Sequence, residues 1–133
     1  MALDPDDLSD DVLTFLRERH LATLTTLRTD GSPHVVAVGF SYDAAAKVAR
    51  VITWATSQKA LNAGRMEAAG QRAVVCQVDG GRWLALEGPV RLVTDPDGVQ
   101  PGVDGYAARY REPKARDDRA VIEIDVDRIL GRG

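Results

Sequence analysis

The stretch that decides the fold reads ARVITWATSQKALN at residues 49–62. Its first half is β-branched and apolar, which predicts a buried strand, and its second half favours a helix that begins at Ser57. The first backbone N–H groups of a helix have no internal partner, and the helix dipole is positive at that end. Hydroxyls and one ammonium gather at the same place, on Thr53, Thr56, Ser57 and Lys59. The stretch therefore predicts an anion site suited to a phosphate.

Local chemistry also allows a purely structural interpretation of this stretch. Serine is a common helix N-cap, and lysine is most often a solvated side chain. The rest of the chain has to decide between the two interpretations.

Length and composition limit the classes of protein that this chain can represent. Its 133 residues, 44% hydrophobic and 28% charged, suit one globular domain that spans residues 1–133. The net charge of −3 and the lack of a basic run argue against a nucleic-acid partner. We expect a cytoplasmic protein without membrane contact, because no charged leader or long apolar segment occurs. Cys76 is the one cysteine, which rules out a disulfide within the chain.

Alternating apolar residues and turn signals predict six strands, joined mostly by hairpins. The strands are expected at about 21–27, 33–42, 48–55, 71–78, 82–93 and 120–126. Gly88-Pro89 inside the fifth strand predicts a bulge or an edge, and therefore a bend. This pattern favours a mainly β (α+β) fold, a six-stranded antiparallel barrel with flanking helices, over a doubly wound parallel sheet.

Helices are expected at about 9–19, where Ser9 can act as the N-cap, and at about 57–69. After a loop through Pro101 and Gly102, only a short helical stretch is expected, near 106–111. Both chain ends, 1–5 and 131–133, are expected to be loose.

Two strand segments, 35–38 and 73–76, are apolar on both faces. In so small a chain, a strand that is apolar on both sides implies that a ligand or a second subunit covers its outer face. We therefore expect a homodimer.

No known self-sufficient catalytic motif occurs in the sequence. Dinucleotide and nucleotide phosphate loops, a zinc-protease helix and a serine nucleophile elbow are all missing, and two histidines do not suggest a metal site. His34 can be interpreted as a proton donor or as a structural strand residue, and Trp83 as a cover for a planar ligand or as a packing residue. No catalytic residue can be assigned, so an enzyme of this sequence would borrow its reactive group from a cofactor.

Several segments together resemble a known superfamily. The hairpin HLATLTTLRTDGSPHVVAV at 20–38, followed by TWATSQKALN at 53–62, resembles the pyridoxamine-phosphate-oxidase-like split β-barrel superfamily. Within it, the chain is similar to the flavin/deazaflavin oxidoreductases of actinobacteria, and to the subgroup that includes deazaflavin-dependent biliverdin reductases. That similarity rests on RHLA at 19–22, VAVGF at 36–40, SQKA at 57–60 and QVDGGRWLALEG at 77–88. It implies a split-barrel homodimer with a cofactor groove at the subunit interface.

The resemblance also implies positions for the cofactor. Its ring would lie against the second strand, and its phosphate would be held where the anion site is inferred above. The implied cofactor-binding residues are His34, Val35, Val36, Ala37, Thr53, Thr56, Ser57, Lys59 and Asn62, with Gln77, Val78 and Trp83 from the other subunit.

One departure from the superfamily pattern bears on the choice of cofactor. Flavin-binding members carry Arg-Lys after the serine, whereas this chain has Gln58-Lys59 and so one positive charge fewer. This favours coenzyme F420 over flavin mononucleotide (FMN), which remains the alternative. The implied activity is hydride transfer from reduced F420 to a planar conjugated acceptor such as biliverdin, a tetrapyrrole. A protein that only binds F420 or a tetrapyrrole, and an FMN-dependent oxidoreductase, are the other hypotheses.

An acceptor of this type carries carboxylates, and a basic segment is available to bind them. Arginine pairs well with carboxylates because its fork donates two parallel hydrogen bonds. The candidate substrate-binding residues are Arg109, Arg111 and Lys114, followed by Arg116 and Arg119. Alternatively, this segment is a solvated loop whose charges are balanced by Glu112, Asp117 and Asp118.

Overall fold

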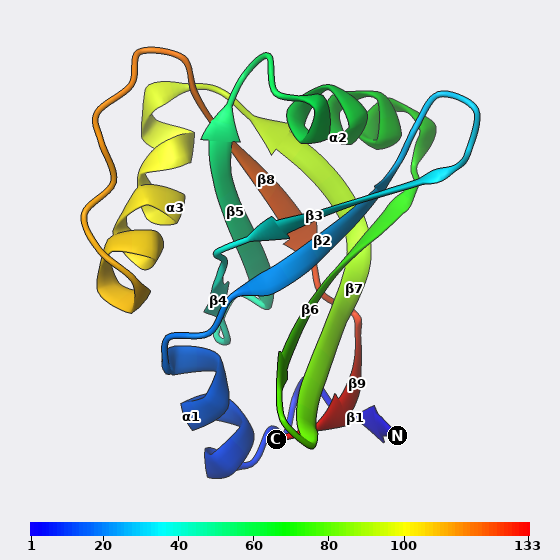
Figure 1. Cartoon of the computed structure of the whole chain (residues 1–133), viewed down its shortest axis with the longest axis vertical. Coiled ribbons are helices and arrows are strands. Elements are labelled where there is room, and N and C mark those ends of the chain that lie inside the picture. Colours follow the sequence, from blue (N-terminus) through cyan, green and yellow to red (C-terminus); the bar gives the residue numbers. More distant parts are fainter.

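A computed structural model describes all residues from 1 to 133, with three helices and nine strands (Figure 1). The elements in chain order are β1 (Ala2–Leu3), α1 (Asp10–Arg17), β2 (Ala22–Leu27), β3 (Pro33–Val38), β4 (Ser41–Asp43), β5 (Val48–Trp54), α2 (Gln58–Ala69), β6 (Arg72–Asp79), β7 (Arg82–Val93), α3 (Pro96–Arg109), β8 (Arg119–Asp125) and β9 (Arg128–Arg132). None of the helices combines the length and the apolar character that a membrane crossing needs.

All strand pairs are antiparallel, in the order β3-β2-β6-β7-β8-β5-β4, with β9 between β7 and β1. The two ends of this path, β3 and β4, follow one another in the chain and are joined only by Gly39 and Phe40. The sheet therefore curls back on itself without closing, and we call the place where its two edges meet the seam. The predicted mainly β, antiparallel fold is confirmed.

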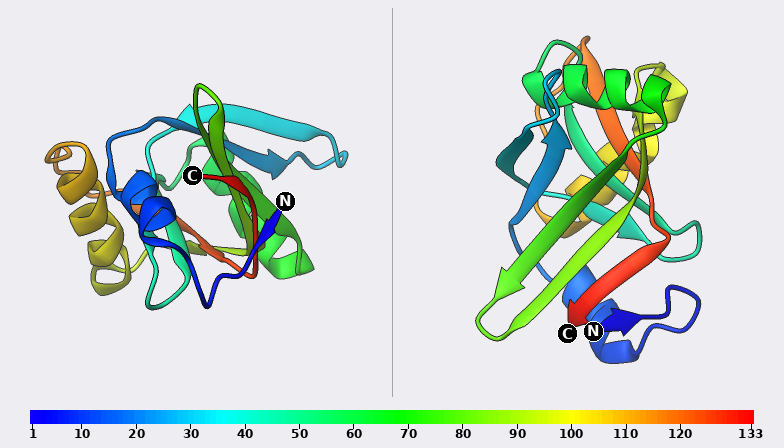
Figure 2. Two further views of the ribbon diagram at one scale, coloured as in Figure 1. Left: turned by 90° about the horizontal axis from the view of Figure 1, so that it is seen from below. Right: turned by 90° about the vertical axis from the view of Figure 1, so that its right-hand side faces the viewer.

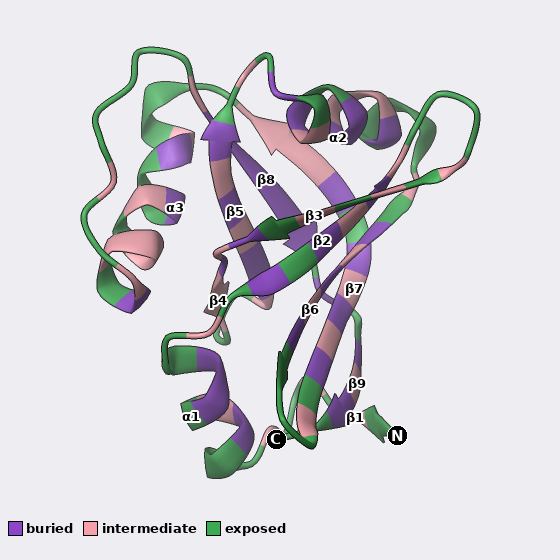
Figure 3. Cartoon of the chain, viewed as in Figure 1, coloured by how far each residue is buried: buried purple, intermediate pink, exposed green.

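The core fills the inside of the curled sheet. Inward-facing side chains from most strands are fully buried, among them Leu24, Val75, Leu86 and Ile122. Figure 3 shows buried residues alternating with more exposed ones along β7, whereas β8 is buried along most of its length. Helix α2 lies across one end of the sheet, α1 lies near the other end, and α3 packs beside β5 and β4 (Figures 1 and 2). Hydrophobic burial on one face of each element thus holds the layers together.

Six predicted strands become nine in the structure. The predicted strand 33–42 is interrupted at Gly39 and Phe40, because β3 and β4 belong to opposite edges of the sheet. The tail expected to be loose forms β9, which pairs with β7 from Arg128 opposite Glu87 to Arg132 opposite Trp83. The first residues, also expected to be loose, pair with β9 as β1. These pairings join distant segments, so no local pattern indicates them.

The short helix predicted near 106–111 is wrong in extent, because α3 runs over Pro96–Arg109. Its N-cap is Asp95, whose side chain accepts a hydrogen bond from the backbone N–H of Gly98. Glycine and proline inside the segment predict a loop. Gly102 and Gly105 instead allow close packing, since a Cβ at these positions would lie 2.8 Å from Val121 and 2.4 Å from Ser41. Tertiary packing overrides the low helix propensity here.

The bend expected at Gly88-Pro89 is where β7 changes partners. Residues up to Pro89 pair with β6, and Val90 to Val93 pair with β8. At Gly88 the chain passes so close to β8 that an added Cβ would lie 1.7 Å from the backbone oxygen of Asp125.

We expect Gly88→Ala to lower the free energy of unfolding by about 2 kcal/mol or more, because a backbone oxygen cannot swing away from the new methyl group. Gly64→Ala is the control: it lies inside α2, and its new Cβ would meet only Leu92 at 3.4 Å. This change should stabilise the protein by about 0.5–1 kcal/mol. Urea denaturation measures both, and equal stabilities for the two variants would contradict the close approach.

Candidate functional site

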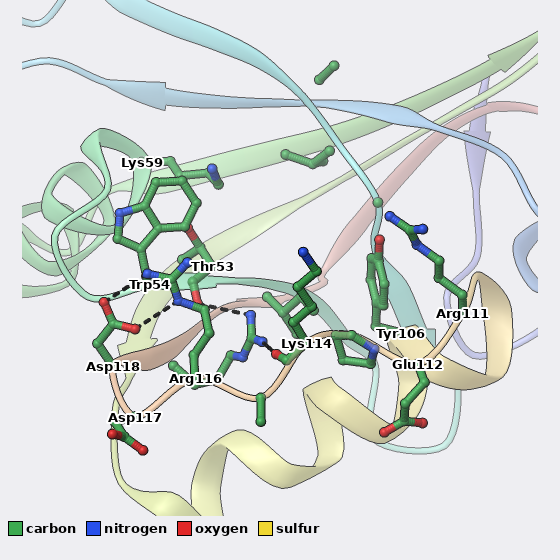
Figure 4. A pocket seen from close by; sticks show the side chains of 17 residues that line it. Thr53, Trp54, Lys59, Tyr106, Arg111, Glu112, Lys114, Arg116, Asp117 and Asp118 are labelled. Carbon is green, nitrogen blue, oxygen red and sulfur yellow. Dashed lines mark hydrogen bonds and ion pairs between the residues drawn. The ribbon is translucent and has the colours of Figure 1, made fainter.

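A cavity of about 900 Å³ opens beside the seam (Figure 4). Its walls are the end of β3, the end of β5, the first turn of α2, Tyr106 of α3 and the loop at 111–118. Thr53, Trp54 and Lys59 line one end, and Tyr106 lines the other, where Gly39 lies against its ring. The volume lies within the range of small-molecule sites.

The first end of the cavity contains two linked hydroxyls. Ser57 is the N-cap of α2 and accepts a hydrogen bond from the backbone N–H of Ala60. The Oγ1 of Thr53 lies 2.7 Å from the Oγ of Ser57, so one of the two hydroxyl hydrogens is used between them. Either hydroxyl can be the donor in this bond, and Thr53 is the member of the pair that lines the cavity. When Ser57 donates to Thr53, the hydroxyl hydrogen of Thr53 is free to donate to a ligand.

Lys59 adds a positive charge at the same end. Its Nζ lies 5.1 Å from the centre of the Trp54 ring, it has no carboxylate partner, and burial lowers the pKa of its ammonium. The guanidinium of Arg116 also lies over this ring, at 5.0 Å, and is paired with Asp118. Two cations thus contact one indole, and of the two only Arg116 forms an ion pair. A bound anion would stabilise this arrangement by offsetting the remaining positive charge.

Of the other residues predicted to contact the cofactor ring or its phosphate, some line the cavity and others do not. Ala37 lines the cavity, whereas His34, Val35 and Val36 do not. Thr56 is exposed outside it.

Asn62 points into the protein rather than toward a ligand. It is fully buried, its Nδ2 donates to the Oγ1 of Thr26, and its Oδ1 accepts from Gln58. These bonds use the amide to connect α2 with β2.

Arg109 and Gln77 are interior residues, contrary to the positions expected for them. The guanidinium of Arg109 donates to the backbone oxygens of Phe40 and Glu18, both at 2.8 Å, and to the Oε1 of Gln77 at 2.7 Å. Gln77 is fully buried and donates through Nε2 to the backbone oxygen of Phe15. Arg109 is thus not part of a solvated loop, and Gln77 does not face a second subunit. Burial among uncharged acceptors lowers the pKa of Arg109.

Val78 and Trp83 lie on the outer face of the sheet, away from this chain's cavity. Val78 is 62% exposed and Trp83 36% exposed. They pair across β6 and β7, and Val35 is exposed on the edge strand β3. These side chains form part of an apolar surface, which we call the outer face; it consists of Thr23, Thr25, Val35, Ala37, Val74, Cys76, Val78, Trp83 and Ala85.

The basic segment after α3 forms the outer wall of the cavity. Arg111, Lys114 and Arg116 are exposed and line it, as Arg119 does from the start of β8. Acidic neighbours line it too, but only Asp118 forms an ion pair within the loop, with Arg116. Arg111 and Lys114 are therefore available to an acidic ligand.

Tyr106 is a cavity residue that sequence reasoning missed. It reaches the cavity because α3 is longer than predicted and packs its face against the seam. An added Cβ on Gly39 would lie 3.0 Å from the Tyr106 ring, so the glycine leaves room for the tyrosine. The VAVGF segment contains this glycine, but its purpose depends on a helix about 65 residues away in the chain.

Comparison with known proteins places this arrangement in a family. A family model described as pyridoxamine 5'-phosphate oxidase matches residues 8–133. The chain belongs to the pyridoxamine 5'-phosphate oxidase family. The resemblance seen in its sequence is thereby confirmed.

Relatives of this family member include a characterised protein and solved structures. An F420H(2)-dependent biliverdin reductase from Mycobacterium tuberculosis is 55% identical over 124 residues, covering 93% of this chain and 88% of the relative. A conserved hypothetical protein of M. tuberculosis has a similar structure, with a TM-score of 0.75, 22% identity, and coverage of 95% of this chain and 85% of that chain. An F420 reductase gives a TM-score of 0.69 at 23% identity, covering 92% of this chain and 98% of the other. The two structural similarities show a shared fold.

We expect Arg109→Met to lower the free energy of unfolding by about 3 kcal/mol, because it leaves several buried acceptors without donors. Arg111→Met removes the same charge from an exposed position and should change stability by less than about 0.5 kcal/mol. Denaturant unfolding of both variants measures the difference. A loss below about 1 kcal/mol for Arg109→Met would contradict its interior role.

Proposed function

We propose that this protein is an oxidoreductase that uses reduced coenzyme F420 to reduce a planar tetrapyrrole of the biliverdin type. The observation that carries this function is the unpaired Lys59 beside Thr53 at the N-terminus of α2, in a cavity large enough for a cofactor. The mycobacterial relative, whose name states F420H(2) dependence and biliverdin reduction, supports the assignment at 55% identity.

The residues present fit the phosphate of such a cofactor. Lys59 supplies a charge without a competing carboxylate, Thr53 supplies a hydroxyl donor, and the first backbone N–H groups of α2 supply further donors. The indole of Trp54 keeps the Lys59 ammonium at the cavity wall. The bound reduced deazaflavin supplies the hydride, while the chain binds and orients the two reactants.

The cofactor ring would then lie toward Ala37 and Gly39, since both line the cavity and Gly39 lies against Tyr106, at the end away from Lys59. The acceptor would meet Arg111 and Lys114, which are exposed along the outer wall. Paired hydrogen bonds from arginine suit the carboxylates of a tetrapyrrole. In the same proposal, Ser57 holds Thr53 in place, and Asn62 supports α2 from inside.

We also propose that the protein is a split-barrel homodimer whose subunits meet through the outer face. This surface includes Val35, Val78 and Trp83, all more than one-third exposed. Glu87, which lies opposite Val74 on the same face, is paired with Arg128. Ala37 belongs both to the outer face and to the cavity wall. A second subunit seated there would bring its Val78 and Trp83 toward the cofactor groove.

Fluorescence titration tests the choice of cofactor, because Trp54 lines the cavity and reports on a bound ligand. We expect coenzyme F420 to quench the tryptophan emission with saturation and FMN to bind more weakly. Purified protein with the reduced coenzyme should then convert biliverdin. Preference for FMN would overturn the cofactor, and tight F420 binding without turnover would favour a binding protein.

Removing the charge of Lys59 tests the phosphate site. We expect Lys59→Met to weaken F420 binding by about 1.5–3 kcal/mol, roughly 10- to 150-fold, because one charge-assisted hydrogen bond is lost while the aliphatic stem is kept. Arg17→Met, on the exposed side of α1, removes a charge elsewhere and should leave affinity unchanged. Unchanged affinity in Lys59→Met would place the phosphate elsewhere.

A charge on the outer face tests the dimer. We expect the wild-type chain to sediment at twice its mass of 14.4 kDa and Val78→Glu to sediment as a monomer, because a buried unpaired carboxylate opposes association. Ala108→Glu, which adds a carboxylate on the exposed side of α3, should remain dimeric. A wild-type monomer at micromolar concentration would contradict the dimer.

A further inference from the structure

We propose that the hydroxyl of Tyr106 donates the proton that accompanies hydride transfer to the acceptor. This inference rests on the proposed function and adds a residue to it. The acceptor gains a hydride at a carbon of its conjugated chain and a proton at a neighbouring nitrogen. Tyr106 gives that proton from its O–H and regains one from water, while the coenzyme releases its own second proton to water. The sum is a two-electron reduction in which two hydrogens pass from coenzyme to acceptor.

Tyr106 is the one tyrosine that lines the main cavity. Figure 4 shows its hydroxyl pointing into the hollow, on the side where Arg111 lies. The other two phenols are not available. Tyr110 donates to the backbone oxygen of His20 and accepts from the N–H of Phe40, and the Tyr42 hydroxyl is buried. The Tyr106 hydroxyl makes no hydrogen bond with the protein and is free to meet a ligand.

The position of the Tyr106 ring is fixed by its surroundings. The ring lies against Gly39, where even one added carbon would approach to 3.0 Å, and against Tyr110, with ring centres 5.0 Å apart. Tyr110 is itself anchored to the backbone of Phe40. A general acid has to be held within hydrogen-bond distance of the atom that it protonates, and this packing holds the hydroxyl in one place.

The hydroxyl of Tyr106 also lies at the end of the cavity where the cofactor ring is expected. The anion-binding group Lys59 occupies the opposite end, so a cofactor anchored there extends its ring toward Ala37 and Gly39, next to Tyr106. Arg111 enters the cavity on the same side and would stabilise the phenolate that remains after proton transfer. Lys114 is a second possible acid on this wall, but it is an exposed side chain on a loop.

Tyr106→Phe removes the hydroxyl and keeps the ring. We expect the single-turnover rate with reduced F420 and biliverdin to fall roughly 10²-fold, the lower end for a lost general acid, because water can enter this open cavity. The dissociation constant of F420 should stay within about twofold. A small weak acid such as imidazolium, added at constant pH and ionic strength, should raise the rate of Tyr106→Phe and leave the wild-type rate unchanged.

Tyr42→Phe is the matched control, because the hydroxyl that it removes is buried and makes no hydrogen bond. It should react at the wild-type rate. A wild-type rate in Tyr106→Phe would overturn the role of Tyr106 and leave the proposed function intact. A slow Tyr106→Phe that weak acid does not rescue would overturn the proton transfer in favour of a positioning role. A wild-type protein that neither binds F420 nor reduces biliverdin would overturn both.

Discussion

The rest of the structure depends on the hydrogen bonds that the backbone N–H and carbonyl groups of Phe40 form at the seam. Strands β3 and β4 are the two edges of the sheet, so the peptide groups that join them have no strand beside them. A buried peptide group without a partner is costly. Two side chains from the end of α3 replace the missing strand: Arg109 donates to the oxygen of Phe40, and the Tyr110 hydroxyl accepts from its N–H. Arg109 also bonds to α1 and β6, so one guanidinium ties the open sheet to two helices.

The cavity is a consequence of the same seam. Because the sheet does not close, Gly39 is left uncovered by a neighbouring strand, and α3 lies beside it. The residues that fix the seam, Arg109 and Tyr110, are the last of α3 and the first after it, and the basic loop starts immediately behind them. The position of Tyr106 and the start of the loop are therefore set by the bonds that stabilise the fold. In this chain, the stability of the open sheet is thus connected to the geometry of the candidate site.

Much of the fold and part of the site could be predicted from the sequence, and the reasons for the failures are physical. Strand alternation and the Ser57 cap depend on neighbouring residues, so most of the strands and the position of Lys59 at the N-terminus of α2 follow from local patterns. Helix α3 contradicts its own propensities, because Gly102 and Gly105 serve contacts with distant strands. Arg109 resembles its exposed neighbour Arg111 in sequence, and only the seam distinguishes them. Contacts of Val78 with a second chain are not encoded locally, and the sequence indicates them only through strands that are apolar on both faces.

The distribution of ion pairs separates structural from functional charges. Glu123 on β8 is buried and forms ion pairs with Arg50 of β5 at 2.8 Å and with Arg91 of β7 at 2.7 Å. The cost of burying its carboxylate is therefore compensated within the chain. Lys59 is partly buried as well, yet no carboxylate compensates it, and burial lowers the pKa of its ammonium. Lys59 therefore lies beside the cavity without the compensation within the chain that Glu123 has. A ligand that supplies the opposite charge would provide that compensation, and this contrast is the physical argument for our proposal that the phosphate binds at Lys59.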